Sequence, residues 1–271
     1  MKQLYRFSVI ALSLLALSFT SCSDYLDRDD DDNITEADVF ARYEKVNGLV
    51  SDVYANAKKA DRPLVFFEHF SNSAITDECE GTNVEGNITN NFNNGAWNPN
   101  SLPGSCGQYW ESLYEGIRKT NLIIENVQKY NTPDNPQQDG DLRNRIGEMY
   151  FMRGYFHMLL LRMYGEAPYI DYVVRAGDNM DFKKESAHAM VEKIVADAQT
   201  AYGMVPNKYV KTSENFGRVD KGACLGLISF VRWIAATPLW NGASQYGYNL
   251  RRVFENEYTY DINRWRRAKE A

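Results

Sequence analysis

The sequence is poor in the residues that build metal centres and disulfide scaffolds. Its 271 residues include three His and four Cys, too few for a disulfide-stapled module or an evident zinc cluster. Basic residues are in the minority, and the formal net charge of -6 argues against a nucleic-acid backbone as a partner. With 44% hydrophobic residues, the composition excludes a disordered tail and a collagen.

Signature motifs of several enzyme classes are missing as well. The sequence contains no Gly-x-Gly-x-x-Gly, no P-loop, no Gly-x-Ser-x-Gly and no His-Glu-x-x-His. We therefore expect no catalytic residues, no metal site and no cofactor. One enzymatic alternative stays open, a helical-repeat glycoside hydrolase, because its paired carboxylates could be any of the 36 acidic residues.

The N-terminus has the layout of a secretory signal. Lys2 and Arg6 precede an apolar run at residues 7–19, and small polar residues follow this run. The run is too short to span a bilayer comfortably. We expect residues 1–21 to be a signal peptide that is removed from the mature protein.

Cys22 lies at the end of this apolar run, where a lipoprotein signal places its acylated cysteine. Several acyl chains on one residue, palmitate among them, give stable membrane anchoring. We therefore predict a lipoprotein signal peptide with Cys22 as the lipid-attachment site; the alternative is plain secretion with an ordinary thiol. Residues 22–34 include four consecutive acidic residues, Asp29 to Asp32, and we interpret this solvated segment as an acidic tether or as a surface-export signal.

Helical periodicity dominates from Thr35 onward. A capping pair, Thr35 and Asp38, opens the first helical pattern. Apolar residues then recur every three or four positions in the segments 35–60, 109–133, 142–165, 185–202, 219–236 and a last one from about 263.

Two of these segments, 142–165 and 219–236, are strongly apolar, and each is followed by a proline, Pro168 or Pro238. A more amphipathic segment precedes each of them, which predicts a helix pair that is repeated once, with loops of about ten residues between partners. We therefore predict an all-α fold of tetratricopeptide-like helix pairs with long irregular loops over residues 35–271. The last segment would start a third repeat that the end of the chain cuts off.

Residues 61–108 interrupt the helical pattern with clusters of Gly, Asn, Pro and Ser. They combine an aromatic ring with amides and carboxylates, which match the flat face and the hydroxyl groups of a sugar. The predicted ligand-binding residues are Trp97, Asn98, Asn100, Asn83, Asp77 and Glu78. The alternative is that Trp97 fills the core and that the Asn residues cap turns.

Several other polar residues have a structural interpretation. Cys79 and Cys106 could form a disulfide across this loop, or both could be buried free thiols. Cys224 and His157 fall within helical segments, and we expect them in the core. Arg153 falls on the apolar stripe of its helix. Because a buried Arg needs a carboxylate or carbonyl partner, we predict that it bridges the repeats rather than clamps a ligand.

Four segments carry a family resemblance. They are residues 21–27 (SCSDYLD), 110–121 (WESLYEGIRKTN), 152–169 and 217–241. In this order and spacing they resemble the SusD/RagB family of outer-membrane nutrient-binding lipoproteins. The resemblance implies an α-helical protein that is lipid-anchored to the cell outer membrane and faces the outside. It further implies a non-catalytic protein that binds an oligosaccharide or polysaccharide, or a peptide in some members, and delivers it to a SusC-type TonB-dependent transporter.

Members of that family are longer, so the resemblance implies that residues 35–271 form the N-terminal part of the domain. The starch-binding member carries sugar-stacking tryptophans just after an Asp-Glu-Cys stretch. Residues 76–79 match that stretch, but no aromatic residue follows in residues 80–86, which argues against starch as the ligand. A truncated, non-catalytic scaffold is the remaining alternative.

Overall fold

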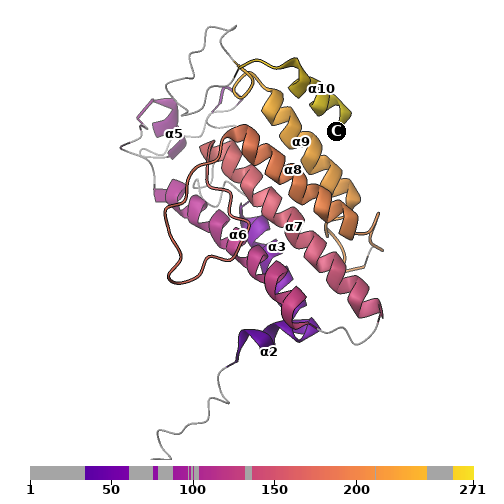
Figure 1. Ribbon diagram of the computed structural model, residues 1–271. Helices are drawn as coiled ribbons and strands as arrows, with labels where there is room; N and C mark the ends of the chain where they lie inside the picture. Colours follow the sequence, from indigo (N-terminus) through magenta and orange to yellow (C-terminus); the bar gives the residue numbers. More distant parts are fainter. Residues whose placement is uncertain are drawn as a thin grey trace, which may run out of the picture. The chain divides into compact units, whose positions relative to one another are not determined.

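The computed structural model describes residues 34–60, 76–78, 88–96, 98, 100, 104–131, 136–210, 212–242 and 259–271. All regular elements in these ranges are α-helices, which confirms the predicted fold class. The helices are α2 (Glu36–Phe40), α3 (Tyr43–Ala60), α5 (Ile88–Asn93), α6 (Gly104–Tyr130), α7 (Pro136–Tyr164), α8 (Ala187–Met204), α9 (Lys221–Ala236) and α10 (Ile262–Glu270) (Figure 1). None of these described helices is both long and apolar enough to cross a membrane. The predicted signal peptide at 1–21 lies outside the described residues.

The chain divides into two compact units, residues 1–38 and residues 39–271. The described part of the first unit contains the predicted capping pair. The backbone N–H of Asp38 donates to Thr35 Oγ1 (3.2 Å), and the backbone N–H of Thr35 donates to Asp38 Oδ2 (3.0 Å). These two bonds satisfy donors that a helix N-terminus would otherwise leave without partners.

The prediction of one helix over residues 35–60 is wrong. A turn separates α2, which ends at Phe40, from α3, which begins at Tyr43. Buried apolar side chains occur on both sides of this turn, at Phe40 and at Val46. The apolar pattern therefore continues through the turn, so periodicity alone predicts one helix where the structure has two.

The long helices of the second unit pack as successive antiparallel neighbours (Figure 1). α6 contacts α3 and α7, α8 contacts α7 and α9, and α10 contacts α9. The pairs α6–α7 and α8–α9 thus form the predicted tetratricopeptide-like repeat. The connections within the pairs differ from the predicted ten residues, because they comprise residues 131–135 in the first pair and 205–220 in the second. α7 begins earlier than predicted, at Pro136, because its first turn is polar and leaves no apolar signal.

Glycines allow the close approach of neighbouring helices. A Cβ atom on Gly147 of α7 would lie 2.7 Å from the Cβ of Met204 at the end of α8. A Cβ on Gly116 of α6 would lie 2.6 Å from the ring of Phe156 on α7. Side chains cannot interpenetrate in a core that is packed like a crystal, so both positions require glycine at the observed helix separation.

A fully buried carboxylate, Glu148, connects α7 to the 205–220 connection. It accepts hydrogen bonds from Arg145 Nη1 (2.7 Å), from Arg218 Nη1 (2.8 Å) and from the Tyr209 hydroxyl (2.7 Å). Arg145 also reaches α3, where its Nε donates to Asn47 Oδ1 (2.8 Å). The two guanidinium groups offset the cost of burying the Glu148 charge, and removing either would leave that charge poorly compensated.

Candidate functional site

The structure places only some of the predicted ligand-binding residues. Trp97 and Asn83 lie outside the described residues, as does the predicted lipid-attachment site, Cys22. The four others are all exposed: Asp77, Glu78, Asn98 and Asn100. Whether the six residues gather around a ligand stays a prediction.

Asn98 caps a turn, as the alternative interpretation of this loop proposes. Its Oδ1 accepts a hydrogen bond from the backbone N–H of Asn100 (3.0 Å). This bond is typical of the local side-chain-to-backbone contacts that Asn makes in turns. A similar local bond fixes the backbone of Glu78, whose N–H donates to Thr76 Oγ1 (3.4 Å).

The cysteines are placed in part. Cys106 lies in the first turns of α6 as a half-buried free thiol, and its possible disulfide partner, Cys79, lies outside the described residues. Cys224 on α9 is buried, which confirms the prediction that it belongs to the core. Burial raises the pKa of the Cys224 thiol to about 12, so this thiol stays protonated and unreactive at neutral pH.

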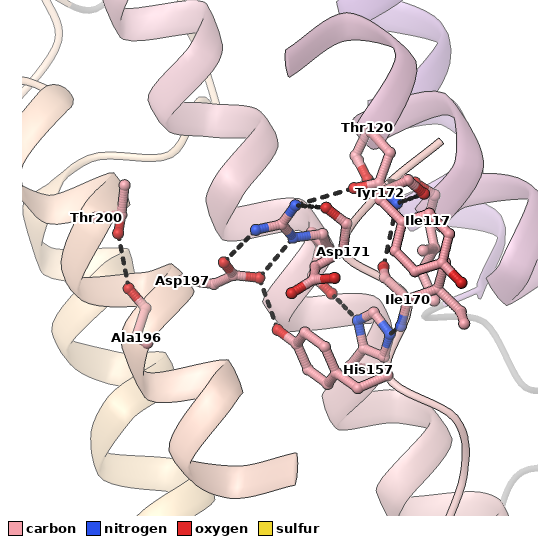
Figure 2. A network of polar contacts seen from close by, with 12 residues as sticks. Ile117, Thr120, His157, Ile170, Asp171, Tyr172, Ala196, Asp197 and Thr200 are labelled. Atoms are coloured by element: carbon pink, nitrogen blue, oxygen red, sulfur yellow. Dashed lines mark hydrogen bonds and ion pairs between the residues drawn. The ribbon is translucent and has the colours of Figure 1, made fainter. Parts of the chain in front are cut away.

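Arg153 bridges the repeats, as predicted. Figure 2 shows the polar network to which its partner Asp197 belongs. Its Nε and Nη2 donate to the two carboxylate oxygens of Asp197 on α8 (2.8 and 2.6 Å). Its Nη1 donates to Asn121 Oδ1 on α6 (3.0 Å) and to the backbone carbonyl of Asp171 (3.0 Å). One guanidinium group on α7 therefore fixes two neighbouring helices and the segment that connects α7 to α8. That segment, residues 165–186, is called the α7–α8 connection below.

His157 anchors the same connection from one turn further along α7. Its Nε2 accepts from the backbone N–H of Ile170 (3.1 Å), so the ring proton is on Nδ1, which donates to the carbonyl of Arg153 (2.8 Å). The ring also stacks on Tyr169, with centroids 3.7 Å apart. Complete burial, reinforced by the nearby Arg153 charge, lowers the pKa of His157 to about 3, so the ring is neutral at physiological pH.

Side chains of α6 and α7 hold the first half of the α7–α8 connection by its backbone carbonyls. The residues whose carbonyls accept these bonds are Pro168, Ile170, Asp171, Tyr172 and Val174. The donors are the Tyr114 hydroxyl, Asn121 Nδ2, Arg153 Nη1 and Arg118 Nη1. The α7–α8 connection has no helix or strand of its own to satisfy these carbonyls. The side chains of α6 and α7 satisfy them instead and thereby fix the connection against α6.

A cavity of about 370 Å³ lies between α6 and this anchored connection. Its lining includes four aromatic rings, those of Trp110, Tyr114, Tyr172 and Phe182. Among the described residues that line it, Arg118 alone carries a charge. The volume falls within the range of about 300–1,000 Å³ that is usual for sites of small ligands.

Aromatic contacts fix the rings of α6 in this cavity. The Trp110 ring lies 4.9 Å from the Tyr114 ring and 5.0 Å from the Tyr164 ring, to which it is nearly perpendicular. The Tyr114 hydroxyl donates to the Pro168 carbonyl at 2.7 Å. Tyr172 contributes from the connection with a side chain that is half exposed. Flat apolar rings with one guanidinium group can stack on a sugar ring and donate hydrogen bonds to its oxygens.

Sequence reasoning missed this cavity. The spacing of Trp110 and Tyr114 fits the apolar stripe of α6 and predicts core positions, and the pattern around Tyr172 and Phe182 predicts no role for either residue. The signal that could have found them is a group of aromatic residues within a loop that follows a Gly and a Pro, Gly165 and Pro168. Aromatic residues in a polar loop need a partner surface, and the nearest apolar helices offer one.

A protein-family model described as SusD-like_3, starch-binding associating with outer membrane, matches residues 24–231. The SusD-like protein P2 of Formosa agariphila is 28% identical over 129 residues, which are 47% of this chain and 24% of that protein. The matched part of this chain therefore spans about a quarter of that relative.

Solved structures share the fold. A SusD homologue from Bacteroides thetaiotaomicron gives a TM-score of 0.62 at 19% identity, and the match covers 80% of this chain and 41% of that one. A laminarin-binding SusD-like protein gives a TM-score of 0.57 at 22% identity and covers 76% of this chain and 46% of that one. The family match extends over most of the chain and includes two of the four resembling segments in whole and more than half of each of the other two. The chain belongs to the SusD/RagB family.

Proposed function

We propose that this chain is a surface-facing lipoprotein of the outer membrane that binds a glycan and delivers it to a SusC-type TonB-dependent transporter. The observation that carries the proposal is the aromatic cavity between α6 and the α7–α8 connection, in a chain that belongs to this family. The family description, starch-binding associating with outer membrane, agrees with a glycan ligand and with the location. The related laminarin-binding protein adds a glycan ligand within the same fold.

Binding would proceed without breaking a bond. The rings of Trp110 and Tyr172 would stack on the apolar face of a sugar ring, and Arg118 would donate to its oxygens. The exposed loop residues around Trp97 would extend the contact to further sugar rings. The mechanism is capture, and the captured glycan leaves unchanged.

The organisation of the chain follows the same proposal. Residues 1–21 would be the signal peptide, Cys22 the acylated anchor and residues 22–34 the tether, with the helical domain at 35–271. The family match begins at Asp24, two residues after Cys22, which agrees with a mature protein that starts at that cysteine.

A glycan array with the chain from Ser23 onward tests the proposal. The expected result is binding of at least one oligosaccharide, with the bound sugar recovered intact by chromatography. Shorter sugars among the recovered material would instead support the glycoside hydrolase alternative. A transporter partner is tested separately, by co-purification of a TonB-dependent transporter with the acylated protein from solubilised outer membranes.

A further inference from the structure

The last described helix is strongly basic in an acidic protein. α10 carries the four basic residues Arg264, Arg266, Arg267 and Lys269 and the single acidic residue Glu270, whereas the whole chain has a formal net charge of -6. Its N-cap, Asp261, accepts from the backbone N–H of Asn263 and fixes the start of the helix. The helix packs against α9.

A small cavity lies where α10 meets α8 and α9, apart from the aromatic cavity. It measures about 90 Å³ and is lined by three guanidinium groups, those of Arg232 on α9 and of Arg264 and Arg267 on α10. α8 contributes the carboxylate of Glu192 and the imidazole of His188. Burial and the charges of Arg264 and Arg267 lower the pKa of His188 to about 4, so this ring adds no charge at neutral pH.

Among the described residues, the charges around this cavity do not cancel. Glu192 is engaged by Arg232, whose Nη1 and Nη2 donate to its two carboxylate oxygens, so these two charges offset each other. Arg267 has Asp261 as its ion-pair partner at 3.8 Å, which is beyond hydrogen-bond distance, and Asp261 is not among the lining residues. An excess of positive charge thus faces the cavity from α10.

Arg264 is held in place by one side chain and one backbone carbonyl. Its Nη1 donates to Asn241 Oδ1 (2.6 Å) and to the carbonyl of Thr259 (2.5 Å). A guanidinium group that is fixed before a ligand arrives loses little conformational entropy on binding. The cavity therefore combines one fixed guanidinium group with that of Arg267, whose ion pair with Asp261 is 3.8 Å long.

We propose that this cavity binds an oxyanion, the carboxylate or sulfate group of an acidic glycan. The glycan part of this inference rests on the proposed function, whereas the oxyanion part rests on the guanidinium groups of Arg264 and Arg267, which line the cavity from α10. The planar guanidinium fork matches pairs of carboxylate or sulfate oxygens and forms charge-assisted hydrogen bonds with them. The volume is well below the ~300 Å³ at which whole-ligand sites begin, so the cavity admits an anionic substituent and not a complete sugar ring.

Calorimetric titration of two variants tests the proposal. Arg267→Gln removes a lining guanidinium group, and Arg266→Gln is the matched control, because it removes the same charge from the same helix at a residue that does not line the cavity. The probes are glucuronate, inorganic sulfate, a uronic-acid oligosaccharide, a sulfated oligosaccharide and a neutral oligosaccharide of equal length. Arg267→Lys serves as a second variant that keeps the charge and loses the fork.

We expect Arg267→Gln to weaken binding of an anionic probe by about tenfold or more, as the loss of a charge-assisted hydrogen bond predicts, and Arg266→Gln to weaken it less than about twofold. The comparison of glucuronate with sulfate identifies the preferred group. Equal weakening in both variants, or no binding of any anion by the wild type, would overturn the oxyanion site. Binding of the neutral oligosaccharide by the wild type is the readout of the proposed function. A wild-type protein that binds the anions but not the neutral oligosaccharide would overturn that function and would still support the oxyanion site.

Discussion

Arg153 and Asp197 form a two-pronged ion pair in the core, with Nε–Oδ2 and Nη2–Oδ1 distances of 2.8 and 2.6 Å. Both side chains are less than a tenth exposed. The Tyr169 hydroxyl donates to the same carboxylate (2.6 Å), which links the ion pair to the α7–α8 connection. The helix pairs and the wall of the aromatic cavity therefore depend on one polar network (Figure 2).

Removing the Asp197 charge should destabilise the fold strongly. In Asp197→Asn, the Arg153 guanidinium group stays buried without its counter-charge, and we expect the free energy of unfolding to fall by about 3–5 kcal/mol. Urea denaturation followed by circular dichroism measures this change. Glu125→Gln is the control, because Glu125 pairs with Arg175 at the surface and should contribute less than about 1 kcal/mol. Similar losses in the two variants would contradict the structural role of the buried pair.

Acidification should destabilise the protein through His157. Its pKa is about 3 in the folded protein, against the ordinary value of 6.5 for a solvated imidazole, so the unfolded chain binds more protons between these values. The contribution of His157 to the free energy of unfolding is therefore fully present above pH 6.5 and is lost as the pH falls towards 3. Between pH 7 and pH 5 this loss is about 2 kcal/mol. His188 adds a loss of the same sign.

The comparison of wild type with His157→Gln isolates this contribution. The variant should be less stable at pH 7 because it loses native contacts, but its free energy of unfolding should fall less between pH 7 and pH 5. Parallel pH profiles for the two proteins would show that the buried imidazole does not cause the acid sensitivity.

A methyl group at Gly147 should separate α7 from α8. The obstacle is the Cβ of Met204, which cannot move without its backbone, so we expect Gly147→Ala to cost about 1–3 kcal/mol. Gly140→Ala in the same helix meets no atom within 4 Å and should stabilise the protein by up to about 1 kcal/mol. Thermal unfolding of both variants shows whether each substitution raises or lowers the stability. A higher stability of Gly147→Ala would refute the close approach of the two helices.

The helices were predictable because their signals are local. Apolar residues every three or four positions locate the bodies of α6, α7, α8 and α9, and Pro168 and Pro238 mark two of their ends. Arg153 was also predictable as a bridge, since a charged residue on an apolar stripe must find a partner. Glu148 is just as buried, yet nothing in the sequence distinguishes it from the other acidic residues.

The aromatic cavity was not predictable in the same way. Its wall depends on contacts between distant residues, such as the Tyr114 hydroxyl and the Pro168 carbonyl, which are 54 positions apart. Propensity and periodicity describe neighbours along one helix, so they cannot show which side chains will bind the backbone of a loop. The predicted binding role of the loop residues around Trp97 rests on their chemistry alone and stays a prediction.

Lipid attachment should depend on Cys22 alone. In cells grown with labelled palmitate, the wild-type protein should carry the label and sediment with outer membranes. Cys22→Ala should lose both properties, because no other residue offers the modified position. Retention of the label in Cys22→Ala would place the anchor elsewhere.

Sugar binding by the aromatic cavity is tested most directly by titrating Tyr172→Ala with the oligosaccharide that binds best to the wild type. Tyr172 is half exposed, and its backbone carbonyl, which accepts from Asn121, remains in the variant. We expect at least about a tenfold loss of affinity with an unchanged melting temperature, as for other aromatic anchors of binding sites. Tyr202→Ala, an exposed tyrosine on α8 outside the cavity, should bind like the wild type. Full affinity in Tyr172→Ala, together with its loss in Trp97→Ala, would instead place the sugar on the predicted loop and contradict a binding role for the cavity.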